Sequence, residues 1–268
     1  MDQVNQKCVR FADSWVTVDV YGEDDGSALV LIPGVMADSA AWAEVARGLQ
    51  GWETVAVVNR RGREPSGPLT GDYDLRREVQ DAEAILRRFC DVQTLFGWSY
   101  GGTIALHLAN TVPVPHVVAY EPIMAPFGAA ALPDLRSARR EDDLDRTVDV
   151  ALRQVTGMPD DAVAALRADE HVWSELREVS GSLYAETLAL NEAAVPERFA
   201  ERASRIDLIL GERNRGKPPY GTTFEDVAAR VPRGTVRELA GQGHLAHLEA
   251  PRALARLVSE LRVPASMR

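Results

Sequence analysis

The amino-acid sequence predicts an α/β protein with a mostly parallel sheet and helices on both of its faces. Two observations lead to this class. Short apolar segments alternate along the chain with longer segments of helical periodicity, which is the pattern of parallel strands joined by helices. Several of the apolar segments are also continuous runs, as expected for strands that are buried on both faces of a sheet.

Seven segments have the character of strands. The first, at 15–21, alternates between apolar and polar residues. The others are apolar runs at 29–32, 54–58, 93–96, 116–120, 206–210 and 235–239.

Helices are expected between these strands. Apolar residues recur every three or four positions over 75–89, which places them on one helix face. A shorter helix is expected over 41–49, with Asp38 or Ser39 as its N-cap. Leucine and valine spacing over 254–261 marks the last helix.

The alternation stops between residues 123 and 203. This segment is almost wholly helical in pattern, with breaks near Pro133, Gly157 and Pro196, and the strand–helix pattern resumes after it. We therefore expect a core formed by residues 1–122 and 204–268, with a helical cap at 123–203. Such an insertion is expected to lie over the carboxyl ends of the strands, where ligands bind in open α/β sheets.

Composition excludes several classes of function. The formal net charge is −10, so a surface that follows nucleic-acid phosphates is not expected. The chain has no apolar signal segment at its start and no apolar run long enough to span a membrane. The two cysteines, Cys8 and Cys90, lack metal-site spacing and are expected to be reduced thiols of a cytoplasmic protein. Neither a metal nor a cofactor is expected.

A candidate nucleophile lies in the segment Gly97-Trp98-Ser99-Tyr100-Gly101. This G-x-S-x-G pattern follows an apolar run and precedes a helical segment. At a sharp strand-to-helix turn the serine is held in a strained conformation, with its hydroxyl exposed above the sheet. A glycine- and serine-rich turn without function is the simpler alternative. The catalytic interpretation therefore requires that the rest of the chain supply a base for the serine and a group that orients the base.

Four segments together make the chain resemble the α/β-hydrolase superfamily. They are Ile32-Pro33-Gly34-Val35, the Asn59–Gly67 turn, the serine segment, and Gly241-Gln242-Gly243-His244. The resemblance covers nearly the whole chain and implies an eight-stranded sheet with a helical cap. It also implies that His244, which lies in the loop before the last helix, is the base that takes the proton of Ser99.

The resemblance also implies an oxyanion hole, which requires two N–H donors. The backbone N–H of Tyr100 would supply one donor and that of Val35, just after Gly34, the other. The family often has His-Gly where this chain has Pro33-Gly34. Backbone donors do not depend on side-chain identity, so this difference leaves the hole intact.

The acid of the triad has two candidates. The superfamily usually places an aspartate after the strand that follows the cap, but here Asn214 occupies that position. Glu121 ends the strand after the nucleophile helix, where some haloalkane dehalogenases and zearalenone-type lactonases have a catalytic glutamate. We favour Glu121, with Glu212 as the alternative and a structural glutamate at a strand end as the simpler interpretation.

The predicted activity is cofactor-independent hydrolysis of a small apolar ester or lactone. C–C bond or thioester hydrolysis by the same triad is the alternative, and a ligand-binding receptor or scaffold of this fold is a third hypothesis, favoured by Asn214. The sequence decides neither the substrate nor whether the protein forms a homodimer. The candidate pocket residues are Gly34, Met36, Trp98, Met124, Phe127, Trp173 and Tyr184.

Overall fold

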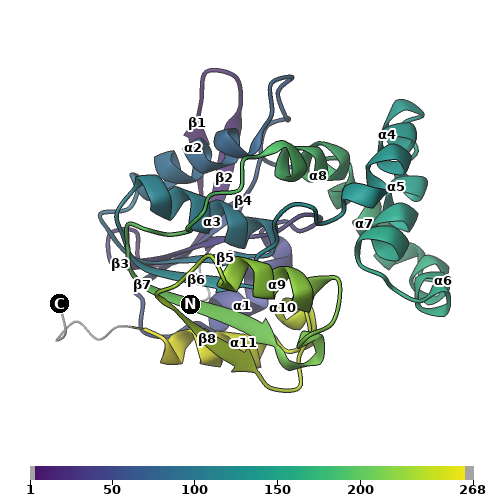
Figure 1. Ribbon diagram of the computed structural model, residues 1–268. Helices are drawn as coiled ribbons and strands as arrows, with labels where there is room; N and C mark the ends of the chain where they lie inside the picture. The colour runs from purple at the N-terminus through teal and green to yellow at the C-terminus, as the bar shows by residue number, and fades with distance from the viewer. Residues whose placement is uncertain (1–3, 263–268) are drawn as a thin grey trace.

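One sheet of eight strands lies at the centre of the computed structural model, which describes residues 4–262 (Figure 1). The expectations for 1–3 and 263–268 lie outside the described residues. The strands are β1 (Val4–Arg10), β2 (Trp15–Gly22), β3 (Ser27–Ile32), β4 (Thr54–Asn59), β5 (Asp91–Trp98), β6 (Val114–Tyr120), β7 (Ala203–Gly211) and β8 (Gly234–Leu239).

The order of the strands in the sheet is β1-β2-β4-β3-β5-β6-β7-β8. The pairs β1–β2 and β2–β4 are antiparallel, and every other neighbouring pair is parallel. Strands β5 to β8 therefore end side by side, and their carboxyl ends form one edge at which residues distant in sequence meet.

All seven expected strands are present, and the eighth is β1. Its sequence, VNQKCVR, is mostly polar, and most of its residues are exposed because it lies at the edge of the sheet. An edge strand that is solvated on both faces needs no apolar run, which is why the sequence pattern did not reveal it.

Helices cover both faces of the sheet. On one face lie α1 (Ala43–Gly48) and α11 (Pro251–Glu260), which pack against each other. On the other lie α2 (Leu75–Leu86), α3 (Tyr100–Thr111) and α9 (Tyr220–Ala228). The short helices η1 (Ala40–Trp42), α10 (Ala246–Glu249) and η4 (Glu212–Asn214) complete the core. No helix among residues 4–262 has the length and apolar composition needed to cross a membrane.

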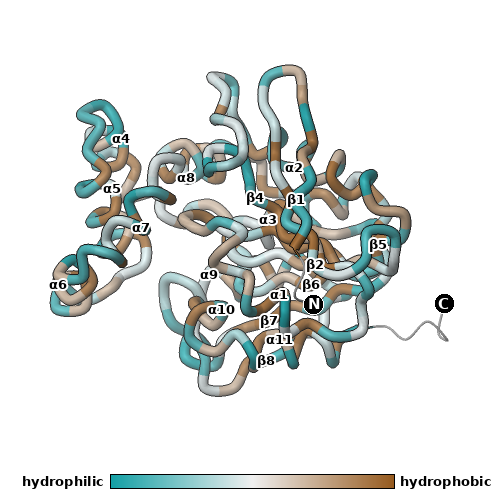
Figure 2. The backbone as a smooth tube through the Cα atoms, turned by 180° about the vertical axis from the view of Figure 1, so that it is seen from behind, coloured by the Kyte–Doolittle hydropathy of each residue, from teal (hydrophilic) through white to brown (hydrophobic). Residues whose placement is uncertain are grey.

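The helical insertion lies between β6 and β7. It consists of η2 (Ala129–Ala131), α4 (Leu132–Arg140), α5 (Leu144–Val150), η3 (Ala151–Val155), α6 (Asp160–Ala168), α7 (Glu170–Ser180) and α8 (Leu183–Glu192). Helices α4 to α7 stand out to one side of the molecule, whereas α8 lies closer to the sheet (Figures 1 and 2). We call this insertion the cap.

The outer helices of the cap have a small hydrophobic core of their own. It is formed by Val148, Leu152, Val163 and Trp173, and Met36 from the loop after β3 packs against it. Figure 2 shows that α4 is largely hydrophilic and that α6 mixes hydrophilic and hydrophobic residues. Leu135 of α4, Val150 of α5, and Ala151 and Val155 of η3 belong to the main hydrophobic cluster instead, so apolar contacts join this part of the cap to the core.

Close packing between β3, β5 and α3 fixes the turn that carries Ser99. A Cβ on Gly101 would lie 2.0 Å from the carbonyl oxygen of Ile32, and one on Gly97 would lie 2.3 Å from that of Gly101. Both clashes are with backbone, which cannot move as a side chain can. The two glycines therefore let helix and strands approach closely.

We predict that Gly101→Ala destabilises the fold, because the new methyl group overlaps the end of β3. The expected loss is about 1–3 kcal/mol or more in the free energy of unfolding, measured by denaturant titration. Gly71→Ala is the matched control, since nothing lies within 4 Å of a Cβ at that position. Equal stability of the two variants would contradict this account of the turn.

Candidate active site

Ser99 lies at the sharp turn between β5 and α3. Its backbone angles are φ 55° and ψ −122°, a conformation that a residue with a side chain rarely adopts. Its N–H donates to the carbonyl oxygen of Tyr120 at 2.9 Å, which ties the turn to the end of β6. Residues are held in such strained conformations mainly at functional sites. Ser99 is only 2% exposed, so its surroundings nearly close it off from bulk water.

His244 lies in the loop between β8 and α10. Its Nδ1 is 2.7 Å from Oε2 of Glu121. Its backbone carbonyl accepts a hydrogen bond from Nε1 of Trp98 at 2.9 Å, which ties the histidine loop to the residue before Ser99. With its proton on Nδ1 and facing the carboxylate, a neutral imidazole keeps the lone pair on Nε2 free to accept a proton.

Glu121 directly follows β6 and is fully buried. Its φ is 42°, and its N–H donates to the carbonyl oxygen of Ile209 on the neighbouring strand β7 at 2.9 Å. Its Oε1 accepts a hydrogen bond from the N–H of Gly211 at 2.8 Å. This backbone arrangement turns the carboxylate across the ends of β6 and β7 toward His244.

Asn214 fills the position where the superfamily usually has an aspartate. Its Nδ2 lies 2.9 Å from each carboxylate oxygen of Glu121. Asn214 therefore donates to the carboxylate of Glu121 and does not take the place of the acid beside the imidazole. The alternative acid, Glu212, accepts a hydrogen bond from the N–H of Gly241 at 2.6 Å. Of the two glutamates proposed for the triad, Glu121 is therefore the one hydrogen-bonded to His244.

The environment of His244 keeps its imidazole neutral near pH 7. Burial lowers its pKa from the ordinary value of 6.5, while the hydrogen bond and negative charge of Glu121 act in the opposite direction without cancelling this effect. A neutral imidazole is the form that can act as a general base.

Two aromatic rings pack against the imidazole. The ring of Tyr220 stacks on it with the centroids 3.6 Å apart and the planes 14° apart. The indole of Trp98 lies 4.7 Å from it at an angle of 35°. The sequence does not indicate a role for Tyr220, which follows two prolines at the start of α9 and belongs to no recognisable motif. Together the rings fix the plane of the imidazole and can stabilise its cation.

The backbone around Gly34 lies directly beside Ser99. A Cβ on Gly34 would be 2.8 Å from Cβ of Ser99 and 2.9 Å from the indole of Trp98. Val35 follows in this loop, and Tyr100 is the first residue of α3, whose N–H has no partner within the helix. The two expected oxyanion donors thus belong to segments on either side of the serine.

The predicted pocket residues fall into two groups. Met124, Phe127, Val35 and Met36 pack in the hydrophobic cluster that also contains Tyr220, the ring against His244. Trp173 instead lies in the core of the cap, and its indole N–H donates to Asp145.

The hydroxyl of Tyr184 accepts a hydrogen bond from Arg136, and its ring lies beneath two arginines of α4. These contacts place Trp173 and Tyr184 within the cap. Both side chains pack against other residues of the cap. That they line the substrate pocket stays a prediction.

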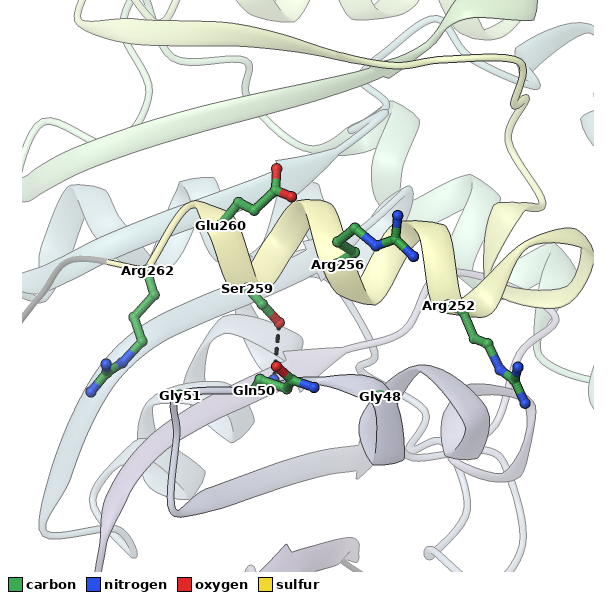
Figure 3. Close-up of a pocket in the computed structure, with 8 residues that line it drawn as sticks. All are labelled: Gly48, Gln50, Gly51, Arg252, Arg256, Ser259, Glu260 and Arg262. Atoms are coloured by element: carbon green, nitrogen blue, oxygen red, sulfur yellow. Dashed lines mark hydrogen bonds between the residues drawn. The ribbon is translucent and has the colours of Figure 1, made fainter.

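A separate open groove of about 820 Å³ lies between α1 and α11 (Figure 3). Gln50 and Ser259 face each other there, and the backbone N–H of Gln50 donates to the Ser259 hydroxyl at 2.9 Å. None of its lining residues belongs to the candidate site. No cluster of potential metal ligands occurs within residues 4–262.

Sequence comparison identifies the family to which the chain belongs. The family model described as the alpha/beta hydrolase family matches residues 29–257. The chain belongs to the alpha/beta hydrolase family. This match spans β3 to α11 and therefore includes the serine turn, the cap and the histidine loop.

The proteins to which this chain is similar differ in what their names describe. The chain is 27% identical over 269 residues to the magnesium-chelatase 30 kDa subunit of Rhodobacter capsulatus, covering 91% of this chain and 89% of that protein. An alpha/beta hydrolase from Sphaerobacter thermophilus has a similar structure, with a TM-score of 0.77, 25% identity, and 95% and 99% of the two chains covered. An enol-lactonase from Burkholderia xenovorans shares the fold, with a TM-score of 0.72 at 17% identity and coverage of 95% and 98%.

We predict that Glu121→Gln lowers the pKa of His244 further below its ordinary value. The carboxylate is the group that opposes the effect of burial, so its removal leaves desolvation unopposed. An NMR titration of the histidine ring would measure this change. Glu212→Gln is the control and should leave the His244 pKa unchanged, since Glu212 bonds Gly241 instead. The reverse ranking would mean that Glu212 contacts the imidazole in solution.

Proposed function

We propose that the protein is a serine hydrolase that cleaves a carboxylic ester or lactone with a Ser99–His244–Glu121 triad. The observation that carries this proposal is the 2.7 Å contact between His244 Nδ1 and Glu121, in a loop that Trp98 ties to the strained turn of Ser99. That contact provides what a serine needs to become a nucleophile, which is a neutral, oriented base.

In the proposed reaction, Ser99 attacks the carbonyl carbon while Nε2 of His244 takes the hydroxyl proton. Glu121 stabilises the imidazolium that forms, and the N–H groups of Val35 and Tyr100 donate to the oxyanion. The imidazolium then protonates the leaving alkoxide, which departs from an ester or stays attached in a lactone. Water, activated by His244, hydrolyses the acyl-enzyme and restores the serine. The mechanism requires no cofactor.

The nature of the surroundings favours a small apolar substrate. Met36, Met124 and Phe127 belong to the apolar cluster next to the histidine, and the overall charge of −10 disfavours large anionic partners. Thioester or C–C bond hydrolysis would use the same three side chains, so it stays the alternative chemistry. The enol-lactonase among the structural relatives shows only that the fold is compatible with lactone cleavage.

We predict that a fluorophosphonate probe labels Ser99 in the wild-type protein and that His244→Ala abolishes labelling. Mass spectrometry of the labelled peptide identifies the residue. Glu121→Gln should lower kcat for an activated aryl ester by about 10⁴-fold, as loss of the triad carboxylate does in serine proteases. Glu212→Gln is the control and should keep nearly full activity.

The pH dependence has a defined direction. Because the pKa of His244 lies below 6.5, kcat/KM should be constant around pH 7 and fall only below pH 6.5, as the imidazole becomes protonated. In Glu121→Gln the pH below which the remaining kcat/KM falls should be lower still, because the pKa of His244 is lower. An acid limb above pH 6.5 in the wild-type protein would contradict the assignment of His244 as the base.

A second candidate function is that of a non-hydrolytic binding subunit. The similarity to the magnesium-chelatase 30 kDa subunit and the low exposure of Ser99 favour it. A correctly folded protein that neither reacts with fluorophosphonate nor hydrolyses aryl esters, thioesters or lactones would support this function and refute the hydrolase.

A further inference from the structure

Four buried charged side chains lie beside the loop after β3 that contains Pro33 and Gly34. Arg60 and Arg63 come from the loop after β4, Glu78 from α2 and Glu186 from the cap helix α8. Nη1 of Arg60 lies 2.7 Å from both Glu78 and Glu186, and Arg63 forms a two-point pair with Glu186 at 2.8 and 2.9 Å. Two positive and two negative charges thus balance inside the protein.

The remaining donors of Arg60 are directed at the loop after β3. Its Nε donates to the carbonyl oxygen of Pro33 at 2.9 Å and its Nη2 to that of Gly34 at 2.7 Å. The carbonyl of Gly34 belongs to the same peptide unit as the N–H of Val35. Because the carbonyl and N–H of a trans peptide point in opposite directions, a fixed carbonyl also fixes the N–H.

We propose that Arg60 is a positioning residue for the oxyanion hole, held in place by Glu186 of the cap. The inference rests on the proposed hydrolase function. Arg60 acts through the Gly34–Val35 peptide: its charged hydrogen bond orients that peptide and polarises it, which strengthens the Val35 N–H as a donor. Its guanidinium also lies 5.2 Å from the ring of Tyr100, the residue that carries the second donor.

Opposite charges within the network favour the ionised forms of Glu186 and Arg60. Burial alone would raise the pKa of Glu186, but Arg60 and Arg63 outweigh it and lower that pKa to about 2. Burial alone would lower the pKa of Arg60, and Glu186 and Glu78 outweigh it and raise it. Glu186 and Arg60 therefore both remain charged around neutral pH.

Stability alone does not explain such a network. Desolvating two charge pairs costs about as much as their attraction returns, and apolar residues of similar size often stabilise a fold equally well or better. What apolar residues cannot do is donate two hydrogen bonds to defined carbonyl groups. Glu186 also extends this hold to the cap: if α8 moves away from the core, Arg60 loses an anchor and the Val35 N–H loses its fixed direction. The position of the cap is thereby coupled to the orientation of the Val35 N–H in the oxyanion hole.

The test compares Arg60→Lys with Arg61→Lys. Arg61 is equally buried and forms a two-point pair with Asp81 at 2.6 and 2.7 Å, but its described contacts do not include the Pro33–Gly34 carbonyls. Lysine keeps the positive charge in both variants but lacks the several N–H donors of the planar guanidinium. Arg60→Lys should lower kcat for an aryl ester by about 10²-fold with little change in KM, the effect of losing an oxyanion donor. Arg61→Lys should keep kcat even if its melting temperature falls.

A second measurement does not require turnover. The Val35 amide resonance in a ¹⁵N NMR spectrum should move in Arg60→Lys, because its peptide is no longer polarised, and should stay in place in Arg61→Lys. Glu186→Gln, which removes only a charge, should produce a smaller shift and a smaller fall in kcat. An unmoved Val35 resonance in Arg60→Lys, or equal kcat in the two lysine variants, would overturn the proposal. A wild-type protein without esterase activity would refute the hydrolase function, while the NMR comparison would still decide what Arg60 does.

Discussion

The hydrogen bond between His244 and Glu121 is the interaction on which the candidate site depends. It joins a loop after β8 to the end of β6, and the donors that surround the carboxylate, Gly211 and Asn214, come from the end of β7. Three neighbouring strands are therefore needed to place and satisfy one acid. Without the carboxylate, the buried imidazole would lose its hydrogen-bond partner at Nδ1 and the counter-charge for its cation.

The position of the acid explains the asparagine nearby. The usual aspartate of this superfamily would here lie within hydrogen-bonding distance of Glu121, and two carboxylates so close cannot both remain ionised. Asn214 has nearly the same shape and donates where aspartate would repel. A neutral donor at position 214 is therefore compatible with the buried carboxylate of Glu121, and Asn214 is its hydrogen-bond partner.

The fold follows closely from the sequence because burial leaves a periodic signal. The apolar runs identified all the parallel strands, and the absence of strand patterns between β6 and β7 indicated the helical insertion. The edge strand β1 and the packing of the outer cap were not apparent. An exposed strand needs no apolar residues. The sequence around Trp173 is the same whether its side chain lines a pocket or packs within the cap, so the sequence does not distinguish the two.

The sequence by itself determined the local parts of the site. Ser99 and His244 lie in short motifs whose glycines are required by backbone geometry. Such motifs can be recognised from residues that are adjacent in the sequence. Only the tertiary structure decided which glutamate meets the imidazole, that Tyr220 stacks on it, and that Arg60 bonds the carbonyl of Gly34. These contacts join segments 24 to 123 residues apart, and their geometry depends on strand order and loop direction, which no local pattern encodes.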